Sequence, residues 1–429
     1  MIHKKNKIPS ILGKEIEFEI RDIAFGGAGV GRVSDRQYST NPSVECAPTN
    51  DPSSSNSACS SSSPLPSSVS HLPSTTAAAL PPTSHLPPLT SILSGGRIVS
   101  SDIACFTKGV IDGETVKARV RRHKARLMEA DLVEVLVASP HRVEPPCPYF
   151  LRCGGCSYQH ITYSHQLEIK EKQLREALRR IGGIQEPLVK TIIPSPEPFH
   201  YRNRITVHVN GGAPGFFVER GHKVIEIDHC LIASEEVNKG LKNLKSKRPP
   251  DGDYLIGEKQ HYGGFRQVNN AVASILLEEV GRCAGSGELL VDAYCGAGFF
   301  AHALRESFTK VIGIERSRGS IIMAREQAHP HEEFLEGGVE ELLAEGLAGG
   351  SPSQTVLILD PPSEGISDLI VATILSSPPA KIVYISCNPA TLARDIKRLS
   401  ECYQLEESTP LDMFPQTAEI ESVSLLKLS

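Results

Sequence analysis

The stretch VDAYCGAGFF, residues 291–300, decides the fold class of the C-terminal part of the chain. It begins as the end of an apolar, β-rich run, passes through two glycines that permit a tight turn, and leads into a segment of helix length. An acidic residue, Glu315, closes the next apolar run about 20 residues further on. A strand, a glycine-rich turn and a helix in this order are typical of the first unit of a doubly wound α/β domain.

The same pattern continues from about residue 260 to the end of the chain. Apolar runs alternate with helix-length segments and occupy residues 289–292, 310–315, 355–360, 381–386 and 423–428. This alternation predicts a doubly wound α/β domain. The first four runs end at Asp292, Glu315, Asp360 and Ser386, and Cys387 follows the last of these. Because ligands of such sheets bind at the carboxyl ends of the strands, we expect these polar groups to gather at one edge.

The glycine-rich turn indicates which cofactor the domain binds. Glycines let a ligand approach the backbone, and Glu315 can hold two ribose hydroxyls. A G-x-G signal by itself also fits a nicotinamide dinucleotide. However, the turn at 292–298 reads D-x-x-C-G-x-G and lacks the third glycine that a pyrophosphate-binding turn requires. The pattern therefore favours S-adenosylmethionine, a cofactor without phosphates.

Three further motifs supply candidate catalytic groups. DPP (360–362) places a carboxylate on a rigid turn, SCNP (386–389) places a thiol after a strand, and FPQTAEIE (414–421) offers Glu419 and Glu421. Individually they fit a strand-ending turn, a buried cysteine and surface carboxylates. Together they suit methylation at carbon 5 of uracil. That reaction needs a thiolate to add at carbon 6, a carboxylate near the ring and a base to remove the carbon 5 proton.

The N-terminal part predicts a small β-barrel of the oligonucleotide-binding kind, because short alternating strands recur with turn glycines at 26–32. Residues 35–95 interrupt it with a Ser- and Pro-rich tract of low charge, which we expect to be disordered. Two basic clusters, 117–126 and 242–248, are candidates for RNA contact or for an ordinary solvated face.

The middle segment is predicted to contain a helix from about Ser164 to Ile181, ended by Gly182. Its leucines and Ile181 form one apolar stripe that we expect to pack in a core, and its Lys and Arg residues fall on the other side. An RNA-facing helix is the alternative.

Four cysteines near this helix have metal-ligand spacing. Cys147, Cys153 and Cys156 lie within ten residues beside two glycines, and Cys230 follows later. One C-x2-C pair with two more distant cysteines fits either zinc or a [4Fe-4S] cluster, with unrelated buried cysteines as the remaining alternative.

Composition limits the class of protein. The net charge of −5 excludes a uniformly basic nucleic-acid-binding surface, so recognition depends on where the charges lie. No apolar run approaches the roughly 18–20 residues that cross a bilayer, and no apolar signal-peptide core follows the N-terminal lysines. We therefore expect a soluble, cytoplasmic protein without membrane contact. In a reducing compartment its cysteines serve as ligands, catalytic thiols or core residues more readily than as disulfides.

Several motifs in order carry a resemblance to a known family. They are CGGCSYQH (153–160), YRNR (201–204), FRQVN (265–269), DAYCGAG (292–298), SCNPATLARD (386–395) and MFPQT (413–417). The chain resembles the RNA 5-methyluridine methyltransferases, in particular the 23S ribosomal RNA uracil-5-methyltransferases with a TRAM domain and an iron–sulfur cluster. The resemblance covers nearly the whole chain except the Ser/Pro insert.

The resemblance implies a role for individual residues. Cys387 would be the nucleophile and Glu421 the base. The S-adenosylmethionine contacts would come from Gln267, Tyr294, Glu315 and Asp360, and the [4Fe-4S] ligands would be Cys147, Cys153, Cys156 and Cys230. The chain departs from the family pattern at Glu419, where the family has His, and at Ser363, where it has Arg. It also departs from the family's Asn-rich sequence at 324–331.

The resulting prediction has three domains: a TRAM-like barrel at 10–140 interrupted at 35–95, an iron–sulfur α+β domain at 141–255, and a Rossmann-like methyltransferase domain at 256–429. The expected partner is RNA, with ribosomal RNA first and transfer RNA as the alternative. A catalytically idle RNA-binding assembly factor is the reading from another functional class. We expect a monomer.

Overall fold

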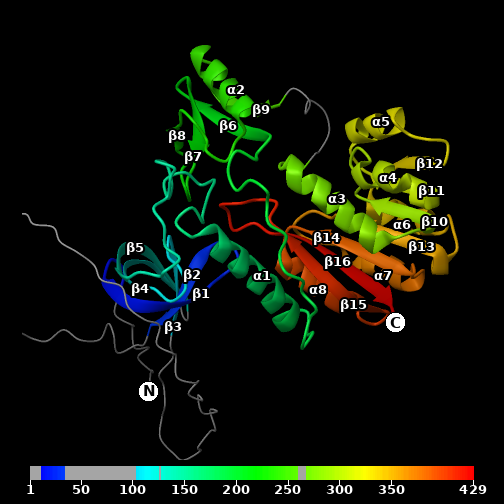
Figure 1. Ribbon diagram of the computed structural model, residues 1–429, viewed down its shortest axis with the longest axis horizontal. Helices are drawn as coiled ribbons and strands as arrows, with labels where there is room; N and C mark the ends of the chain where they lie inside the picture. Colours follow the sequence, from blue (N-terminus) through cyan, green and yellow to red (C-terminus); the bar gives the residue numbers. More distant parts are fainter. Residues whose placement is uncertain (1–10, 34–102, 125–126, 259–266) are drawn as a thin grey trace, which may run out of the picture. The chain divides into compact units, whose positions relative to one another are not determined.

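The computed structural model describes residues 11–33, 103–124, 127–258 and 267–429, all within one compact unit (Figure 1). The tract 35–95 that was predicted to be disordered lies outside the described residues, as do 265 and 266 of the FRQVN motif. No helix in the described ranges is both long and apolar enough to cross a membrane.

The N-terminal strands form a closed five-stranded barrel, which confirms the predicted architecture. The strands are β1 (Glu15–Ile23), β2 (Ala28–Val33), β3 (Ile103–Lys108), β4 (Thr115–Lys124) and β5 (Leu127–Val137), in the order β1-β2-β3-β5-β4. Along β1, Ile16, Phe18 and Ile20 point into the barrel and the glutamates between them are exposed. This period-2 alternation is what a half-buried strand requires.

The middle segment combines a long helix with a small antiparallel sheet. Its elements are α1 (Tyr163–Arg180), β6 (Arg204–Asn210), β7 (Ala213–Phe217), β8 (Val224–Glu226), α2 (Glu235–Ser246) and β9 (Gly252–Gly257). The strands pair in the order β8-β7-β6-β9, and α2 covers the sheet through a shared apolar cluster. Ser234 caps α2 by accepting a hydrogen bond from the amide of Val237.

The surface of α1 differs from the prediction in two ways. Leu174 and Leu178 are buried as expected, but Ile181 is 40% exposed at the helix end. Lys170, which was placed with the other Lys and Arg residues on the side away from the apolar stripe, is fully buried. Both buried leucines belong to the core of the C-terminal sheet, so α1 packs on that sheet although it lies within the range 141–255. Periodicity identifies an apolar stripe but not how far neighbouring elements enclose the helix.

The C-terminal part is a seven-stranded sheet in the order β12-β11-β10-β13-β14-β16-β15, which confirms the doubly wound prediction. Its strands are β10 (Gly287–Ala293), β11 (Phe308–Glu315), β12 (Glu332–Glu336), β13 (Thr355–Leu359), β14 (Lys381–Ser386), β15 (Tyr403–Leu411) and β16 (Glu421–Leu428). The pairings from β12 to β14 are parallel, and β16 is antiparallel to both of its neighbours. The strand order reverses direction at β10, which is where ligands bind in such sheets.

Helices cover both faces of this sheet. The helices are α3 (Asn270–Ala284), α4 (Phe299–Leu304), α5 (Arg318–Glu326), α6 (Val339–Leu347), α7 (Asp368–Ser376) and α8 (Pro389–Leu399). Leu289 and Val291 of β10 join one core with α6, α7 and α8, whereas Leu290 joins the other with α3, α4 and α5. Burial on both faces explains why the strands read as continuous apolar runs rather than alternating ones.

Candidate active site

A cavity of about 590 Å³ opens at the carboxyl ends of the central strands. The loops after β10, β11, β13 and β14 line it, together with the start of β16. All six residues predicted to bind S-adenosylmethionine or to act in catalysis lie on it, namely Gln267, Tyr294, Glu315, Asp360, Cys387 and Glu421. These six residues, which are spread between positions 267 and 421 in the sequence, therefore surround one space large enough for a small ligand.

The glycine-rich turn after β10 forms one end of the cavity. Tyr294, Gly296 and Gly298 all have positive φ, at 67°, 57° and 84°, so the chain reverses sharply here before α4 begins. Glu315 holds this turn, because its Oε2 accepts a hydrogen bond from the amide of Gly296 at 3.2 Å. Its Oε1 accepts from the amide of Ser317 at 2.6 Å. The carboxylate is thus fixed in direction while it still lines the cavity.

Cys387 and Glu421 approach each other because of the pairing between β14 and β16. The last pair in the ladder joins Ser386 to Ser422, and extending the register by one pair sets Cys387 opposite Glu421. Ser422 Oγ also donates to the carbonyl of Ser386 at 3.1 Å. Glu421 is buried and lines the cavity, whereas Glu419 is exposed and does not.

The electrostatics of the cavity favour the neutral forms of Asp360, Glu421 and Cys387. Burial raises the pKa of Asp360 to about 7. The pKa of Glu421 lies well above its usual value because of burial and then the charge of Asp360. Burial, and next the charges of Glu421 and Asp360, raise the pKa of the Cys387 thiol to about 11. A carboxylate with a raised pKa is a stronger proton acceptor when it is ionised.

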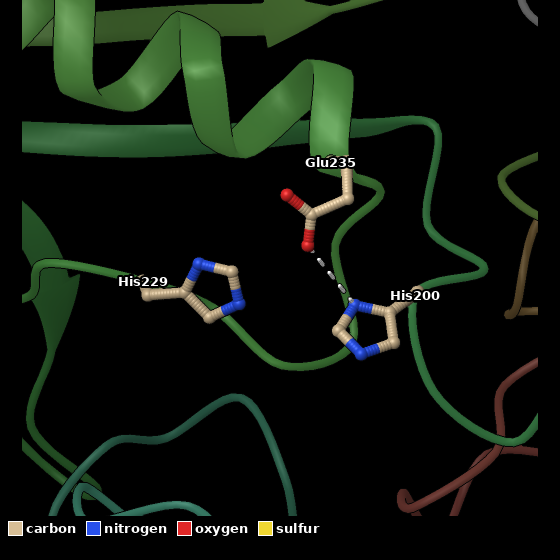
Figure 2. Close-up of side chains that lie close together, drawn as sticks. All are labelled: His200, His229 and Glu235. Carbon is tan, nitrogen blue, oxygen red and sulfur yellow. Dashed lines mark ion pairs between the residues drawn. The ribbon is translucent and has the colours of Figure 1, made fainter.

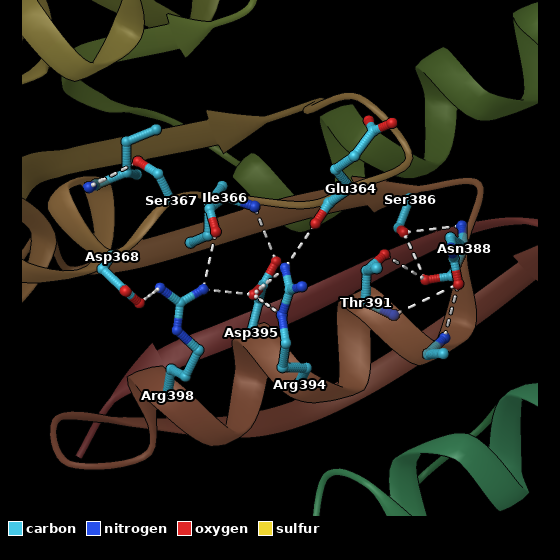
Figure 3. A network of polar contacts seen from close by, with 12 residues as sticks. Glu364, Ile366, Ser367, Asp368, Ser386, Asn388, Thr391, Arg394, Asp395 and Arg398 are labelled. Carbon is cyan, nitrogen blue, oxygen red and sulfur yellow. Dashed lines mark hydrogen bonds and ion pairs between the residues drawn. The ribbon is translucent and has the colours of Figure 1, made fainter.

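The wall beside Cys387 is the loop that follows Asp360, and α8 holds it in place (Figure 3). Asn388 Nδ2 and Thr391 Oγ1 donate to the carbonyl of Ser363 at 3.2 and 3.0 Å. Asp395 is fully buried and accepts hydrogen bonds from the amide of Ile366 at 2.9 Å and from the hydroxyl of Tyr384 at 2.8 Å. Sequence reasoning did not select Asp395, since nothing local shows that one of its partners is the backbone amide of Ile366, 29 residues away in sequence.

Other features of the cavity also differ from what the sequence suggested. Asp292 lies next to the last residue of its strand but is fully buried and does not line the cavity, and its Oδ2 accepts a hydrogen bond from the amide of Ala301 at 2.9 Å. Burial raises its pKa to about 8. Arg316, Glu340 and Phe414 line the cavity and were not predicted. The loops after successive strands share one edge, so examining every post-strand residue would have found Arg316.

A second cavity, of about 550 Å³, brings the four predicted cluster cysteines together. Its lining includes Cys147, Cys153, Cys156 and Cys230. Burial is the main reason that the pKa values of Cys153 and Cys230 are raised and that of Cys156 reaches about 12. Mutual repulsion between the thiolates raises all three as well.

His200, His229 and Glu235 form a separate group whose donor atoms lie within 4.8 Å of one another (Figure 2). His200 and Glu235 are exposed, and their Nδ1 and Oε1 atoms form an ion pair at 3.9 Å. Such surface pairs occur without a metal. This group is separate from the four cysteines, although His229 also lines the second cavity.

Comparison with known proteins identifies the family. Residues 350–429 match the family model for tRNA (uracil-5-)-methyltransferase. An uncharacterised RNA methyltransferase of Bdellovibrio bacteriovorus is 32% identical over 75% of this chain and 89% of its own length. One from Gloeobacter violaceus is 29% identical over 80% of this chain and 96% of its own length.

A solved structure agrees with these sequence matches. Pyrococcus abyssi tRNA (uracil-54, C5)-methyltransferase, in complex with S-adenosyl-L-homocysteine, aligns with a TM-score of 0.59 and 25% identity. The alignment covers 76% of this chain and 96% of that one. The relatives and the methyltransferase fold around the central cavity lead to one conclusion: the chain belongs to the RNA uracil-5-methyltransferase family, which uses S-adenosylmethionine as methyl donor.

Proposed function

We propose that this protein methylates carbon 5 of a uridine in ribosomal RNA, with Cys387 as covalent nucleophile and Glu421 as base. The observation that carries the proposal is the shared cavity, whose lining includes the Cys387 thiol, the buried Glu421, the partly buried Asp360 and the glycine-rich turn. Carbon 5 of uracil is a weak nucleophile, so a thiol placed beside the base-binding space has a chemical purpose that a structural cysteine lacks.

The turn end of the cavity suits S-adenosylmethionine. Glu315 is oriented by two backbone amides and has lone pairs left for the ribose hydroxyls. Gln267, Tyr294 and Asp360 complete the proposed contacts with this co-substrate. The glycines allow close backbone approach, and no third glycine provides for a pyrophosphate. Bound here, S-adenosylmethionine would supply an electrophilic methyl group on its sulfonium.

The proposed chemistry divides between two residues. The Cys387 thiolate forms a bond to carbon 6, which makes carbon 5 an enolate carbon able to take the methyl group. A new carbon–carbon bond forms as the sulfonium–methyl bond breaks. Glu421 then removes the carbon 5 proton, the electron pair restores the carbon 5–carbon 6 double bond, and the thiolate leaves.

The choice of Glu421 over Glu419 as base follows from position. Glu421 is buried, lines the cavity and sits opposite Cys387 in the extended register, while Glu419 faces solvent. The raised pKa of Glu421 makes it an effective proton acceptor once the thiol has been consumed. Asp360 is close enough to influence the pKa of both groups, and we assign it the carboxylate role beside the pyrimidine ring that the reaction requires.

We propose that the four cysteines hold a [4Fe-4S] cluster and not a single zinc ion. Sulfurs around one zinc lie about 3.8 Å apart, as follows from Zn–S bonds of about 2.3 Å in a tetrahedron. The groups of described residues whose donors all lie within 4.8 Å of one another do not include these cysteines, although all four line one cavity. A cluster held there would join the segment 147–156 to Cys230 as a structural cross-link.

Transfer RNA is the second candidate substrate. The aligned Pyrococcus abyssi enzyme acts on uracil 54 of tRNA, and the matching family model carries the tRNA name. Ribosomal RNA is placed first because the cysteine set and the barrel are the features by which the chain resembles the ribosomal enzymes. The two targets share the chemistry and differ only in the RNA that presents the base.

Mapping 5-methyluridine in ribosomal and transfer RNA from cells with and without the protein tests the proposal. We expect one ribosomal position to lose its methyl group and to regain it on complementation. Cys387→Ala should fail to complement while still binding S-adenosylmethionine, whereas Cys402→Ala, which removes a thiol outside the cavity, should complement. If 5-methyluridine is lost from tRNA alone, tRNA and not ribosomal RNA is the substrate. If no 5-methyluridine is lost, a catalytically idle assembly factor is favoured.

A further inference from the structure

The connection between β15 and β16, residues 412–420, carries Phe414 on the cavity wall and leads directly to Glu421. Polar side chains from distant parts of the chain bind its backbone. Lys170 Nζ donates to the carbonyl of Phe414 at 3.1 Å, and the Tyr201 hydroxyl donates to the next carbonyl along at 3.1 Å. This connection is therefore shaped by the middle segment and not by local turn sequence alone.

Gln416 is the most constrained residue of the connection. It is 3% exposed and has a φ of +69°, a left-handed backbone conformation that residues with side chains seldom adopt. Its carbonyl accepts two hydrogen bonds, from the amides of Ser157 at 3.1 Å and Tyr158 at 3.0 Å. These residues immediately follow Cys156. The segment that carries the three cysteines and ends at Tyr158, called the cysteine-bearing segment below, therefore docks on the connection through Gln416.

A second glutamine completes the junction from α1. Gln166 Oε1 accepts from the amide of Gln416 at 3.1 Å, and Gln166 Nε2 donates to Gln416 Oε1 at 3.1 Å. The same Nε2 lies 3.2 Å from the carbonyl of Tyr158 and 2.8 Å from that of Ile161. Gln166 is 1% exposed, so these bonds form away from water, where leaving a polar partner unpaired is costly.

We propose that Gln416 is a positioning residue for uracil methylation. Through its hydrogen bonds, Gln416 connects the cysteine-bearing segment to the residues that complete the active site. Its left-handed backbone and its bonds to Gln166, Ser157 and Tyr158 hold the 412–420 connection so that Phe414 and Glu421 face the cavity. The inference rests on the proposed function, because Glu421 is taken as the base. Backbone strain sustained by surrounding bonds is typical of residues that set active-site geometry.

Two substitutions test this role without touching the cavity. Gln416→Gly keeps the backbone carbonyl and tolerates the left-handed backbone but removes the side-chain carboxamide of Gln416. Gln166→Ala removes the side chain of Gln166, to which Gln416 is hydrogen-bonded. Misplacement of a catalytic group by about 1 Å can cost about 100-fold in rate. We expect kcat to fall about 10- to 100-fold in both variants, with kcat/KM for RNA and S-adenosylmethionine within about twofold of the original, because the slowed step follows covalent attack and methyl transfer. Covalent protein–RNA adduct should accumulate on unmodified RNA because removal of the carbon 5 proton is slowed.

Gln173→Ala is the matched control. Gln173 also lies on α1, and its Nε2 donates to the carbonyl of Ile23 at 3.0 Å and to the Tyr158 hydroxyl at 3.3 Å. It therefore contacts the cysteine-bearing segment and the barrel, and neither of these hydrogen bonds involves residues 412–420. Its kcat should stay unchanged. Peptide-resolved hydrogen exchange should show faster exchange of residues 412–420 in the Gln416 and Gln166 variants, but not in this control.

Unchanged kcat and unchanged exchange in both test variants would overturn the role of Gln416, and so would an equal loss of kcat in Gln173→Ala. If a test variant is insoluble, Gln416→Asn is tested in its place. Asn tolerates the left-handed region of the backbone, and this substitution leaves helix α1 unaltered. Failure of the unaltered enzyme to make 5-methyluridine would refute the proposed function instead. The exchange measurement would still report on the junction in that case.

Discussion

The raised pKa of Cys387 makes the rate of covalent attack depend strongly on pH. With a pKa of about 11, the thiolate fraction is roughly one in ten thousand at pH 7 and one in a hundred at pH 9. The sign follows from the thiolate being the nucleophile, so raising the pH increases its population. We therefore predict that covalent attack accelerates by up to about 100-fold between pH 7 and pH 9.

A nearby carboxyl should make the observed rise smaller than this limit. The pKa of Asp360 is about 7, so its negative charge develops as the pH passes that value. A new negative charge beside the thiol disfavours the thiolate, since the charge of Asp360 is one of the causes that raise the pKa of Cys387. The expected slope of log rate against pH is therefore positive but less than one.

A 5-fluorouridine-containing RNA provides the assay. Fluorine cannot leave as a proton does, so the methylated adduct should stay attached to Cys387 and appear as a shifted band in denaturing electrophoresis. The band's rate of appearance is measured at each pH with S-adenosylmethionine saturating, and Cys387→Ala serves as the blank. A rate that is flat or falls between pH 7 and pH 9 would refute the reasoning, because it would mean that thiolate formation does not limit attack.

Glu421→Gln should trap the covalent adduct on ordinary RNA while Glu419→Gln turns over normally, as denaturing gels will show; the reverse pattern would move the base by two residues. Lys170→Met should destabilise the protein by about 3–5 kcal/mol in urea unfolding, because it leaves the buried carboxylate of Asp412, 2.5 Å from Lys170 Nζ, without its cation. Lys170→Met combined with Asp412→Leu should recover most of that loss, and a double variant as unstable as the single would contradict the pairing argument. Anaerobically purified protein should be brown with about four irons per chain, and Cys153→Ala should lose solubility first; stoichiometric zinc without iron would argue against the cluster.

Local sequence patterns predicted the elements of the fold well. Each of the five apolar runs of the C-terminal part lies on a strand, and the predicted helix at 164–181 begins and ends within one residue of α1. The reason is that apolar periodicity reflects which faces are buried, and burial on both faces of the sheet produces continuous apolar runs. The polarity of Lys170 misled the prediction, since its partner Asp412 lies 242 residues away and is not visible in a local window.

The sequence by itself determined the chemistry available to this protein: a thiol after one strand, carboxylates after others, a glycine-rich turn, and four cysteines with ligand spacing. Strand periodicity also determined that Glu419 and Glu421 share one face if both lie on one strand, so it could not choose between them. The family motif points to Glu421, and the tertiary structure adds a physical reason to propose it as the base: β16 begins at Glu421, its antiparallel register with β14 sets that residue opposite Cys387, and Glu419 stays in the exposed part of the connection. The left-handed backbone of Gln416 was likewise beyond the sequence, since its partners in α1 and the cysteine-bearing segment come within hydrogen-bonding distance only when the chain has folded.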